Sequence, residues 1–429
     1  MSETRAGTAT DTGATRSPWG DRVAAELDAI RSAGRWRQPR DLATSGAMTG
    51  SVGTAAGPRD VVSFASNDYL GLTHHPAVAA AAHAALDRWG AGTGASRLVV
   101  GSRPLHTELE AELADWKGAD DAVLFPTGYA ANLGLLTTLG GPDVTILSDE
   151  LNHASIVDGS RLARADVRIF RHGDLDHLRD LLTDVAGAAL VVTDSAFSMD
   201  GDVADLPALL ELCAASGALL VLDEAHAVLG PELPAGAARP AGTDDVPVLR
   251  MGTLSKALGS LGGFVAGPRP FVDLLRNRAR TFIFTTAPTP ADTAAALAAL
   301  RIVRSAEGAA LVARLRRNVD RLRPGHPTPI VPVVLGDEAA ALAGAERLLE
   351  RGLLVPAIRP PTVPVGTSRL RVALSAAHTD EQVDRLLGAL AELPGPDGLP
   401  GPDGAAPAAT GTTAAAGTGT ETAGGEHAP

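Results

Sequence analysis

Short, continuous apolar runs recur along the middle of the chain, each bounded by glycine, aspartate or serine. They occupy residues 122–126, 145–148, 167–171, 189–193, 218–222, 248–251 and 263–266, and most are separated by segments with helical periodicity. Runs that are apolar without alternation are typical of strands buried on both faces of a parallel sheet. The pattern predicts a large α/β domain over residues 61–303, with a mostly parallel central sheet and helices on both faces.

A smaller set of elements follows. Residues 289–322 have a helical pattern, and further apolar runs lie at 330–335, 355–358 and 369–373. Helical patterns at 338–351 and 380–393 alternate with these runs. We therefore predict a small C-terminal α+β domain over residues 304–393.

The two ends of the chain depart from this pattern. Within residues 1–60, we predict a leader without an apolar segment, a helix over 21–40 and a linker rich in Thr, Ser, Gly and Ala up to residue 59. Without an apolar segment, the leader is not expected to be a signal peptide. From residue 394 the chain has few bulky apolar residues, and we predict a disordered tail over 394–429.

Composition narrows the possible functions. The chain has 429 residues, 45% of them hydrophobic, and a net charge of −13, which is typical of a soluble acidic protein and unfavourable for binding nucleic acid. Its apolar stretches fall well short of the roughly 20 residues that a membrane span needs. The single cysteine, Cys213, leaves no internal disulfide or thiolate metal cluster, so we expect a cytoplasmic protein without a metal site.

The candidate chemistry starts from Lys256, in the segment GTLSKALG. Its neighbours are small and uncharged, so we expect its ammonium to be partly desolvated. Desolvation lowers the pKa of a lysine and makes the neutral amine available for Schiff-base formation. Read alone, the segment also fits an ordinary surface lysine at the start of a helix.

Polar residues stand just beyond the ends of three apolar runs. Asp223 ends the run ALLVLD and His226 follows it, Ser198 follows ALVVTD, and Lys256 follows VLRMGT. Taken singly, Asp223 could cap a helix and His226 could be a hydrogen-bonded core histidine. Together, a lysine for an imine and a buried carboxylate for a ring nitrogen predict a pyridoxal 5'-phosphate site.

The phosphate of this cofactor needs backbone N–H donors at the start of a helix, with small residues that allow close approach. Gly128 and Tyr129, after Thr127 in VLFPTGYAANLGLL, supply such a start, and Thr253 adds a hydroxyl. His153, in SDELNHASIVDG, is the candidate to lie over the ring, although an ordinary loop histidine has the same local sequence.

Seven segments, taken in order, resemble the α-oxoamine synthases, which are pyridoxal phosphate-dependent enzymes of the aspartate aminotransferase fold. The segments are SNDYLGL, GTGASR, LNHASIVDG, FSMDGD, DEAHAVLG, GTLSKALG and RPPTVPVGTSRLRVALSAAHT. The resemblance runs from about residue 21 to about residue 393. It implies a fold type I pyridoxal phosphate-dependent transferase with a smaller C-terminal domain.

The resemblance also implies roles for individual residues. Lys256 forms the aldimine and acts as the base, Asp223 pairs with the pyridine nitrogen, and His226 donates to the phenolic oxygen. His153 stacks on the ring and takes part in proton transfer. The other implied cofactor contacts are Gly128, Tyr129, Ser198, Thr253, Thr285 and Thr286, and the implied substrate contacts are Arg37, Asn67, Arg359 and Thr362.

The implied substrate and phosphate contacts carry further expectations. Of Arg359 and Thr362, Arg359 is the more natural partner of a substrate carboxylate, because its guanidinium can bind both carboxylate oxygens. Arg35 or Arg40 remains an alternative to Arg37. Thr285 and Thr286 match a segment that in the family reaches the phosphate of a neighbouring subunit, which implies a homodimer with shared sites.

The segment IRPPTVP favours the family member that condenses L-alanine with a pimeloyl thioester in biotin biosynthesis. Pimeloyl-CoA and a pimeloyl-carrier protein both remain open as the acyl donor. The alternatives are glycine C-acetyltransferase, or another α-oxoamine synthase with a different amino acid and thioester. From another class, the alternative is a non-catalytic binding protein that retains the fold.

Overall fold

The computed structural model describes residues 17–55, 57–230 and 242–393. The predicted tail and most of the predicted leader lie outside these ranges. The described residues fall into two compact units, the first formed by residues up to 43 together with 51–59, and the second by 44–50 and the chain from 60 onwards. All of the predicted cofactor-binding residues belong to the second unit.

The first unit begins with helix α1 (Pro18–Ser32), where the Ser17 hydroxyl accepts a hydrogen bond from the Gly20 N–H at 3.1 Å. The helix ends earlier than predicted, and Gly34 beyond it has a positive φ of 63°. Strands replace the predicted linker: β1 (Leu42–Thr44), β2 (Thr49–Thr54) and β3 (Gly57–Ser63). Threonine and valine in these segments favour extended backbone.

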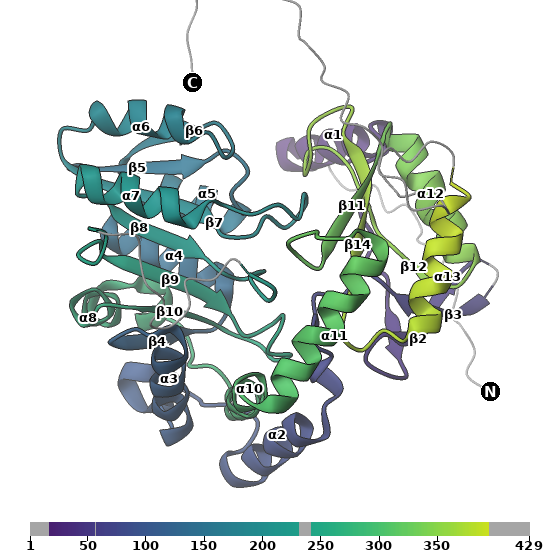
Figure 1. The fold of residues 1–429 in the computed structure, drawn as a ribbon, viewed down its shortest axis with the longest axis horizontal. Coiled ribbons are helices and arrows are strands. Elements are labelled where there is room, and N and C mark those ends of the chain that lie inside the picture. The colour runs from purple at the N-terminus through teal and green to yellow at the C-terminus, as the bar shows by residue number, and fades with distance from the viewer. Residues whose placement is uncertain (1–16, 56, 231–241, 394–429) are drawn as a thin grey trace, which may run out of the picture. The chain divides into compact units, whose positions relative to one another are not determined.

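A seven-stranded sheet forms the centre of the second unit (Figure 1). Each predicted apolar run of the large domain forms one of its strands. These are β4 (Asp121–Phe125), β5 (Val144–Asp149), β6 (Asp166–Phe170), β7 (Ala188–Asp194), β8 (Leu219–Asp223), β9 (Val248–Thr253) and β10 (Gly263–Gly267). Their order is β4-β10-β9-β8-β7-β5-β6, and β10 is antiparallel to both of its neighbours while the other pairs are parallel. The predicted mostly parallel sheet is confirmed.

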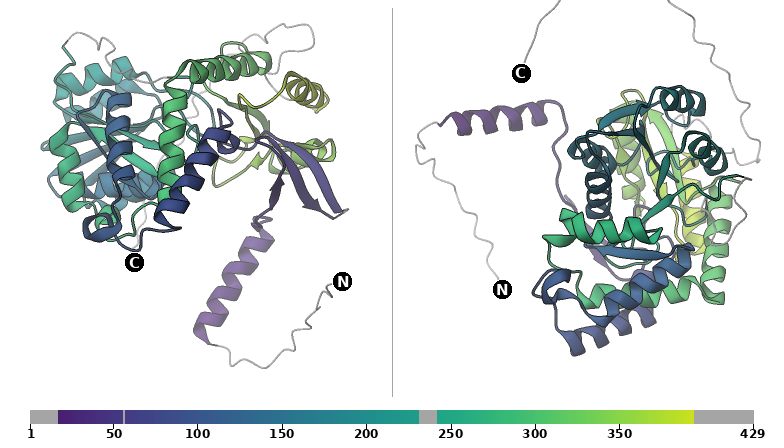
Figure 2. Two further views of the ribbon diagram at one scale, coloured as in Figure 1. Left: turned by 90° about the horizontal axis from the view of Figure 1, so that it is seen from below. Right: turned by 90° about the vertical axis from the view of Figure 1, so that its left-hand side faces the viewer.

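Helices cover both faces of this sheet, as the turned views of Figure 2 also show. The helical elements are η1 (Leu72–His74), α2 (Pro76–Trp89), η2 (Arg97–Gly101), α3 (Pro104–Lys117), α4 (Gly128–Leu139), α5 (Ala154–Leu162), α6 (Leu175–Thr183), α7 (Leu206–Ser216), α8 (Arg269–Arg278), α9 (Arg280–Ile283), α10 (Pro290–Val303) and α11 (Ala306–Leu322). Successive side chains of a strand enter different cores: Ile146 packs with residues of α4, α5, α8 and α9, and Leu147 packs with residues of α6 and α7. No helix in the described part of the chain could span a membrane.

The C-terminal residues of the second unit form a three-stranded sheet of order β11-β14-β13 with two helices. The elements are β11 (Ile330–Gly336), α12 (Glu338–Glu350), β12 (Leu353–Leu354), β13 (Ala357–Ile358), β14 (Ser368–Ala373) and α13 (Asp380–Ala391). The predicted strand at 355–358 is wrong in extent. Pro356 has no N–H for a ladder, and β12 before it pairs with β3 while β13 after it pairs with β14. The domain boundary at residue 303 stays a prediction.

Candidate active site

Strands β7, β8 and β9 are parallel and end at the same edge of the central sheet. Their register pairs Asp194 with Asp223, and Asp223 with Met251. Ligands of such sheets bind at the carboxyl ends of the strands. A cavity of about 220 Å³ lies here, lined by Thr127, Gly128, Tyr129, His153, Ser155, Asp194, Ser198, Asp223, Ala225, His226, Met251, Thr253, Ser255, Lys256 and Leu261. The lining includes every predicted cofactor-binding residue except Thr285 and Thr286.

Lys256 follows strand β9, and its Nζ lies 2.8 Å from Nε2 of His226. Burial lowers the pKa of Lys256 below its ordinary value, and the attraction of Asp223 and Asp194 opposes this shift. A lysine with a lowered pKa supplies the neutral amine that covalent chemistry at a carbonyl requires.

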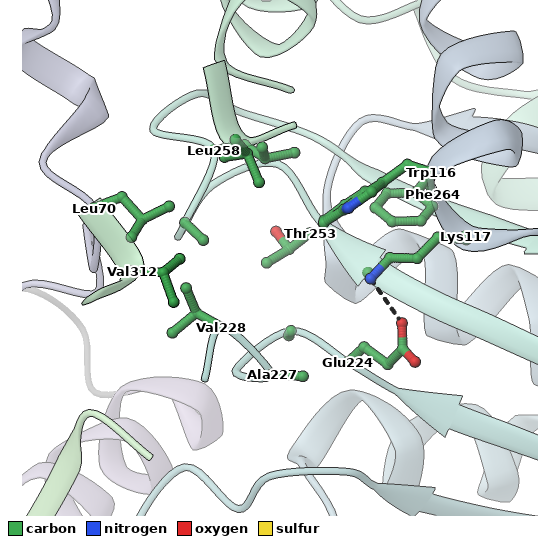
Figure 3. Close-up of a pocket in the computed structure, with 14 residues that line it drawn as sticks. Leu70, Trp116, Lys117, Glu224, Ala227, Val228, Thr253, Leu258, Phe264 and Val312 are labelled. Atoms are coloured by element: carbon green, nitrogen blue, oxygen red, sulfur yellow. Dashed lines mark ion pairs between the residues drawn. The ribbon is translucent and has the colours of Figure 1, made fainter. Parts of the chain in front are cut away.

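The sequence contains only one other lysine, Lys117. Its Nζ forms an ion pair of 3.0 Å with Oε2 of Glu224, and both side chains are at most 3% exposed. Figure 3 shows this pair at a second cavity of about 170 Å³, whose other lining side chains are mostly apolar. Because Lys117 is engaged in this buried pair, Lys256 is the lysine available for an imine.

A chain of hydrogen bonds leads away from Lys256. Burial, with the charge of Lys256 adding to it, lowers the pKa of His226 well below its ordinary value, so the ring is neutral. The Tyr69 hydroxyl donates its one proton to Oδ1 of Asn67 at 3.1 Å, and Arg371 donates to the same oxygen at 3.1 Å. Nδ1 of the neutral His226 ring therefore donates to the Tyr69 oxygen at 2.6 Å, which leaves Nε2 to accept from Nζ of Lys256. Asn67, a predicted substrate contact, therefore ends this chain.

Asp223 is buried, and each of its carboxylate oxygens has a donor. Oδ2 accepts from Nδ2 of Asn132 at 2.8 Å, and Oδ1 accepts from the Ala225 N–H at 2.9 Å. The Asn132 amide also donates to the Ser155 hydroxyl at 2.9 Å. These contacts fix the carboxylate that is expected to face a ring nitrogen.

A second buried acid, Asp194, lies beside Asp223. Burial and the charge of Asp223 raise the pKa of Asp194 well above its ordinary value. Its Oδ2 accepts from the backbone N–H of His153 at 3.0 Å, which anchors the first residue before helix α5. Nδ1 of His153 lies 2.7 Å from the Ser155 hydroxyl, and burial lowers the pKa of this histidine. His153 is thus held in the cavity as a neutral ring.

The part of the cavity lining that comes from the start of helix α4 has the features of a phosphate site. Helix α4 begins at Gly128, and the Thr127 hydroxyl caps it by accepting from the Ala130 N–H at 3.0 Å. A Cβ added to Gly128 would lie 3.3 Å from Cβ of Thr253, so the two segments approach closely here. The Thr253 hydroxyl lies 2.7 Å from that of Ser255. A helix start with hydroxyls beside it binds anions, and with the amine and the carboxylate it fits pyridoxal phosphate.

The remaining predicted residues do not line this cavity. Arg359 is half-buried, with Nη1 3.8 Å from Oε2 of Glu338, and Thr362 is exposed on the same turn, with its N–H donating to the Arg359 carbonyl. Thr285 is half-buried and Thr286 is exposed. Arg37 is exposed, as are its alternatives Arg35 and Arg40, and all three lie in the first unit.

Comparisons with known proteins agree with this site. The family model for aminotransferase class I and II matches residues 59–390. An 8-amino-7-oxononanoate synthase from Anaeromyxobacter dehalogenans strain 2CP-1 is 52% identical over 382 residues, covering 86% of this chain and 95% of the relative. One from Alkalilimnicola ehrlichii is 48% identical over 383 residues, covering 86% and 96%. The chain belongs to the 8-amino-7-oxononanoate synthase family.

Solved structures of related enzymes share this fold. Serine palmitoyltransferase from Sphingomonas wittichii superposes with a TM-score of 0.79 at 33% identity, over 88% of this chain and 97% of that one. A variant of the S. paucimobilis serine palmitoyltransferase, solved with a bound PLP-myriocin aldimine, has a TM-score of 0.78 at 30% identity, over 87% and 97%. These findings confirm the predicted enzyme class, its fold and its cofactor, pyridoxal phosphate, for this member of the 8-amino-7-oxononanoate synthase family.

The structure adds residues to the site that the sequence analysis missed. Asp194 ends an apolar strand as Asp223 does, and that position could have marked it. Asn132 lies one helical turn after Gly128, on the helix predicted to start there. The local sequence marks Tyr69 less clearly as a site residue, because only the fold brings its hydroxyl next to His226.

Proposed function

We propose that this member of the 8-amino-7-oxononanoate synthase family condenses L-alanine with a pimeloyl thioester. The reaction releases carbon dioxide and a free thiol, and gives 8-amino-7-oxononanoate for biotin biosynthesis. One observation carries the proposal: Lys256 and Asp223 lie in one cavity with an anion-binding helix start, in a chain that is 52% identical to a synthase of this name.

Each side chain has a separate role in the proposed reaction. Bound pyridoxal phosphate supplies an electron sink that stabilises negative charge on the Cα of the amino acid. Lys256 would hold the cofactor covalently and would also be the base that takes the Cα proton, because its lowered pKa favours the neutral amine. Asp223, oriented by Asn132, keeps the ring nitrogen protonated. His153 orients the carboxylate end of the amino acid, where carbon dioxide leaves.

Arg359 and Thr362 bind the substrate in this proposal, with the Arg359 guanidinium as the carboxylate partner. Arg37, or its neighbour Arg35 or Arg40, faces the acyl substrate. A cytoplasmic location is supported by the single cysteine of the sequence.

A homodimer with shared sites belongs to the same proposal. Leu98, Val99 and Val100 are consecutive and between 58% and 72% exposed, and Phe284, beside Thr285, is 70% exposed. An exposed run of this kind marks a surface that a partner covers. Thr285 and Thr286 then extend from one copy towards the phosphate of the other. Light scattering on the purified protein is expected to give the mass of two chains.

A substrate matrix tests the reaction. The purified enzyme is assayed with alanine, glycine and serine, each against pimeloyl-, acetyl- and succinyl-CoA, with release of free thiol as the readout. Alanine with pimeloyl-CoA is expected to give the highest kcat/KM. Faster reaction of glycine with acetyl-CoA would identify a glycine C-acetyltransferase instead. A pimeloyl-carrier protein, run beside pimeloyl-CoA, determines which acyl donor the enzyme prefers.

A further inference from the structure

His172, between β6 and α6, bridges two carboxylates outside the cofactor cavity. Its Nδ1 lies 2.9 Å from Oδ1 of Asp149, and its Nε2 lies 2.6 Å from Oδ2 of Asp202. A neutral imidazole has one N–H, so donating to both acids requires the protonated ring. Glu150 is also close, because its carboxylate accepts from the His172 backbone N–H at 3.1 Å.

Asp202 is the last residue of a loop, residues 197–202, that also contains the cavity-lining residue Ser198. The Phe197 N–H donates to the Asp202 carbonyl at 3.0 Å, and the Gly201 N–H donates to the Phe197 carbonyl at 2.9 Å. The Phe197 ring meets the His172 ring edge-on, with centroids 4.4 Å apart. His172 therefore contacts this loop, residues 197–202, in two ways: its Nε2 lies against the Asp202 carboxylate, and its ring packs against the Phe197 ring.

The C-terminal sheet holds the same loop from another direction. The Thr328 hydroxyl donates to the Gly201 carbonyl at 2.8 Å, and Nε of Arg371 donates to the Ser198 carbonyl at 2.5 Å. A Cβ on Gly201 would lie 1.9 Å from the Ile330 carbonyl oxygen, so this side of the loop has no spare room. The loop is thus held between His172, in the connection from β6 to α6, and the residues of the C-terminal strands.

Charge makes the His172 contact strong. The hydrogen bonds that His172 donates to Asp149 and to Asp202 raise its pKa to about 10, against the opposing effect of burial. Charge-assisted hydrogen bonds of this kind are stronger than neutral ones. Asp149 is 3% exposed and also accepts from the N–H groups of Leu151 and Gly173, so it is a fixed anchor for the ring.

We propose that His172 is a positioning residue of the cofactor site. It acts through Asp202, holding the 197–202 loop so that Ser198 stands at the wall of the cavity. The proposal rests on pyridoxal phosphate occupying that cavity. It does not depend on which amino acid or thioester the enzyme uses, so the substrate matrix can fail without affecting it.

The affinity for pyridoxal phosphate provides the test. Loss of a merely structural contact would lower the stability of the protein but would leave its affinity for the cofactor unchanged. Apo-protein is titrated with pyridoxal phosphate, and the dissociation constant is read from absorbance for wild type, His172→Gln, Asp202→Asn and the double variant. The thermal midpoint of each apo-protein is recorded beside it. His75→Gln is the matched control, since it removes another histidine–carboxylate pair, with Glu307 at 3.1 Å, whose members do not line the cavity.

Each single variant is expected to raise the dissociation constant about tenfold, equivalent to about 1.4 kcal/mol. The dissociation constant of the double variant is expected not to exceed the higher of the two single-variant values, because both changes break the same contact. His75→Gln is expected to bind like wild type. Wild-type affinity in His172→Gln, or additive losses in the double variant, would overturn the proposal. If His172→Gln does not fold, Asp202→Asn decides alone, since the Asp202 side chain is 45% exposed and tolerates the change.

Discussion

Asn132 and Asp223, 91 residues apart in the sequence, meet through a hydrogen bond of 2.8 Å from the amide to the carboxylate. The helix after β4 thereby orients the acid at the end of β8. In the proposed function this acid faces the ring nitrogen of the cofactor, so the orientation of its carboxylate would determine how strongly it holds the proton there.

Removing this contact is expected to slow the reaction without unfolding the enzyme. Asn132→Ala takes one donor from a buried carboxylate, a loss of about 1.5–3 kcal/mol. We expect kcat to fall by about tenfold or more, with the KM for alanine changed less. Asn318→Ala is the control, because it removes another buried amide, which donates to the carbonyls of Ser375 and His378 and does not line the cavity. Steady-state kinetics check both, and equal losses in the two variants would contradict the assigned role.

Lys256→Ala tests the choice of lysine. The variant is expected to fold and to bind pyridoxal phosphate without a covalent bond, and to lose about 10²- to 10⁴-fold in kcat, the usual contribution of a positioned base. Borohydride reduction followed by mass spectrometry should label Lys256 in wild type and nothing in the variant. Because Lys117 is the one other lysine, a label at Lys117 would show that the wrong lysine was chosen.

A pair of glycine variants separates cofactor binding from stability. Gly128→Ala puts a Cβ 3.3 Å from Cβ of Thr253 at the proposed phosphate site, so we expect weaker binding of pyridoxal phosphate. Gly388 lies exposed in α13 with nothing within 4 Å of an added Cβ. Gly388→Ala is expected to raise the free energy of unfolding by about 0.4–1 kcal/mol and to leave cofactor affinity unchanged. Titration of the apo-proteins and urea unfolding measure the two quantities.

The histidine between Asp149 and Asp202 predicts a pH dependence of stability. The folded-state pKa of His172 is about 10, above its ordinary 6.5, so folding favours the protonated ring. Its contribution is therefore complete below about pH 6.5 and is lost as the pH rises towards about 10. Urea unfolding of wild type and His172→Gln should show the largest difference in the acidic part of this window. If the difference in unfolding free energy between the two proteins grew with rising pH, the predicted direction of the pH dependence would be wrong.

Local sequence was sufficient to predict the strands of the central sheet and several of the residues that line the cavity. The apolar runs are continuous because both sheet faces are covered. Asp223 ends one of these strands, and Gly128 and Lys256 lie shortly after the ends of two others. Contacts between distant segments were not predictable in this way. Tyr69 meets His226 across 157 residues, and the antiparallel direction of β10 leaves no mark in an apolar run. The strands at 42–59 were missed because their Thr- and Gly-rich sequence also fits a linker.

The buried ion pair of Lys117 with Glu224 leads to the last prediction (Figure 3). Oε1 of Glu224 also accepts from Arg250, at 2.8 Å from Nε and 2.7 Å from Nη2, and Nη1 of Arg250 donates to the Lys117 carbonyl at 2.8 Å. The carboxylate therefore holds two buried cations directly after Asp223 in the sequence.

Glu224→Ala leaves both cations without their common partner. Breaking a buried pair in this way costs about 3–5 kcal/mol, so we expect the free energy of unfolding in urea to fall by about that amount. Glu307→Ala is the control, because its pair with His75 is partly exposed and worth about 0–1 kcal/mol. If the two variants lost similar stability, the buried cluster of Glu224, Lys117 and Arg250 would not be a main source of the protein's stability. A large loss confined to Glu224→Ala would mean that this buried cluster stabilises the fold at the segment that carries Asp223.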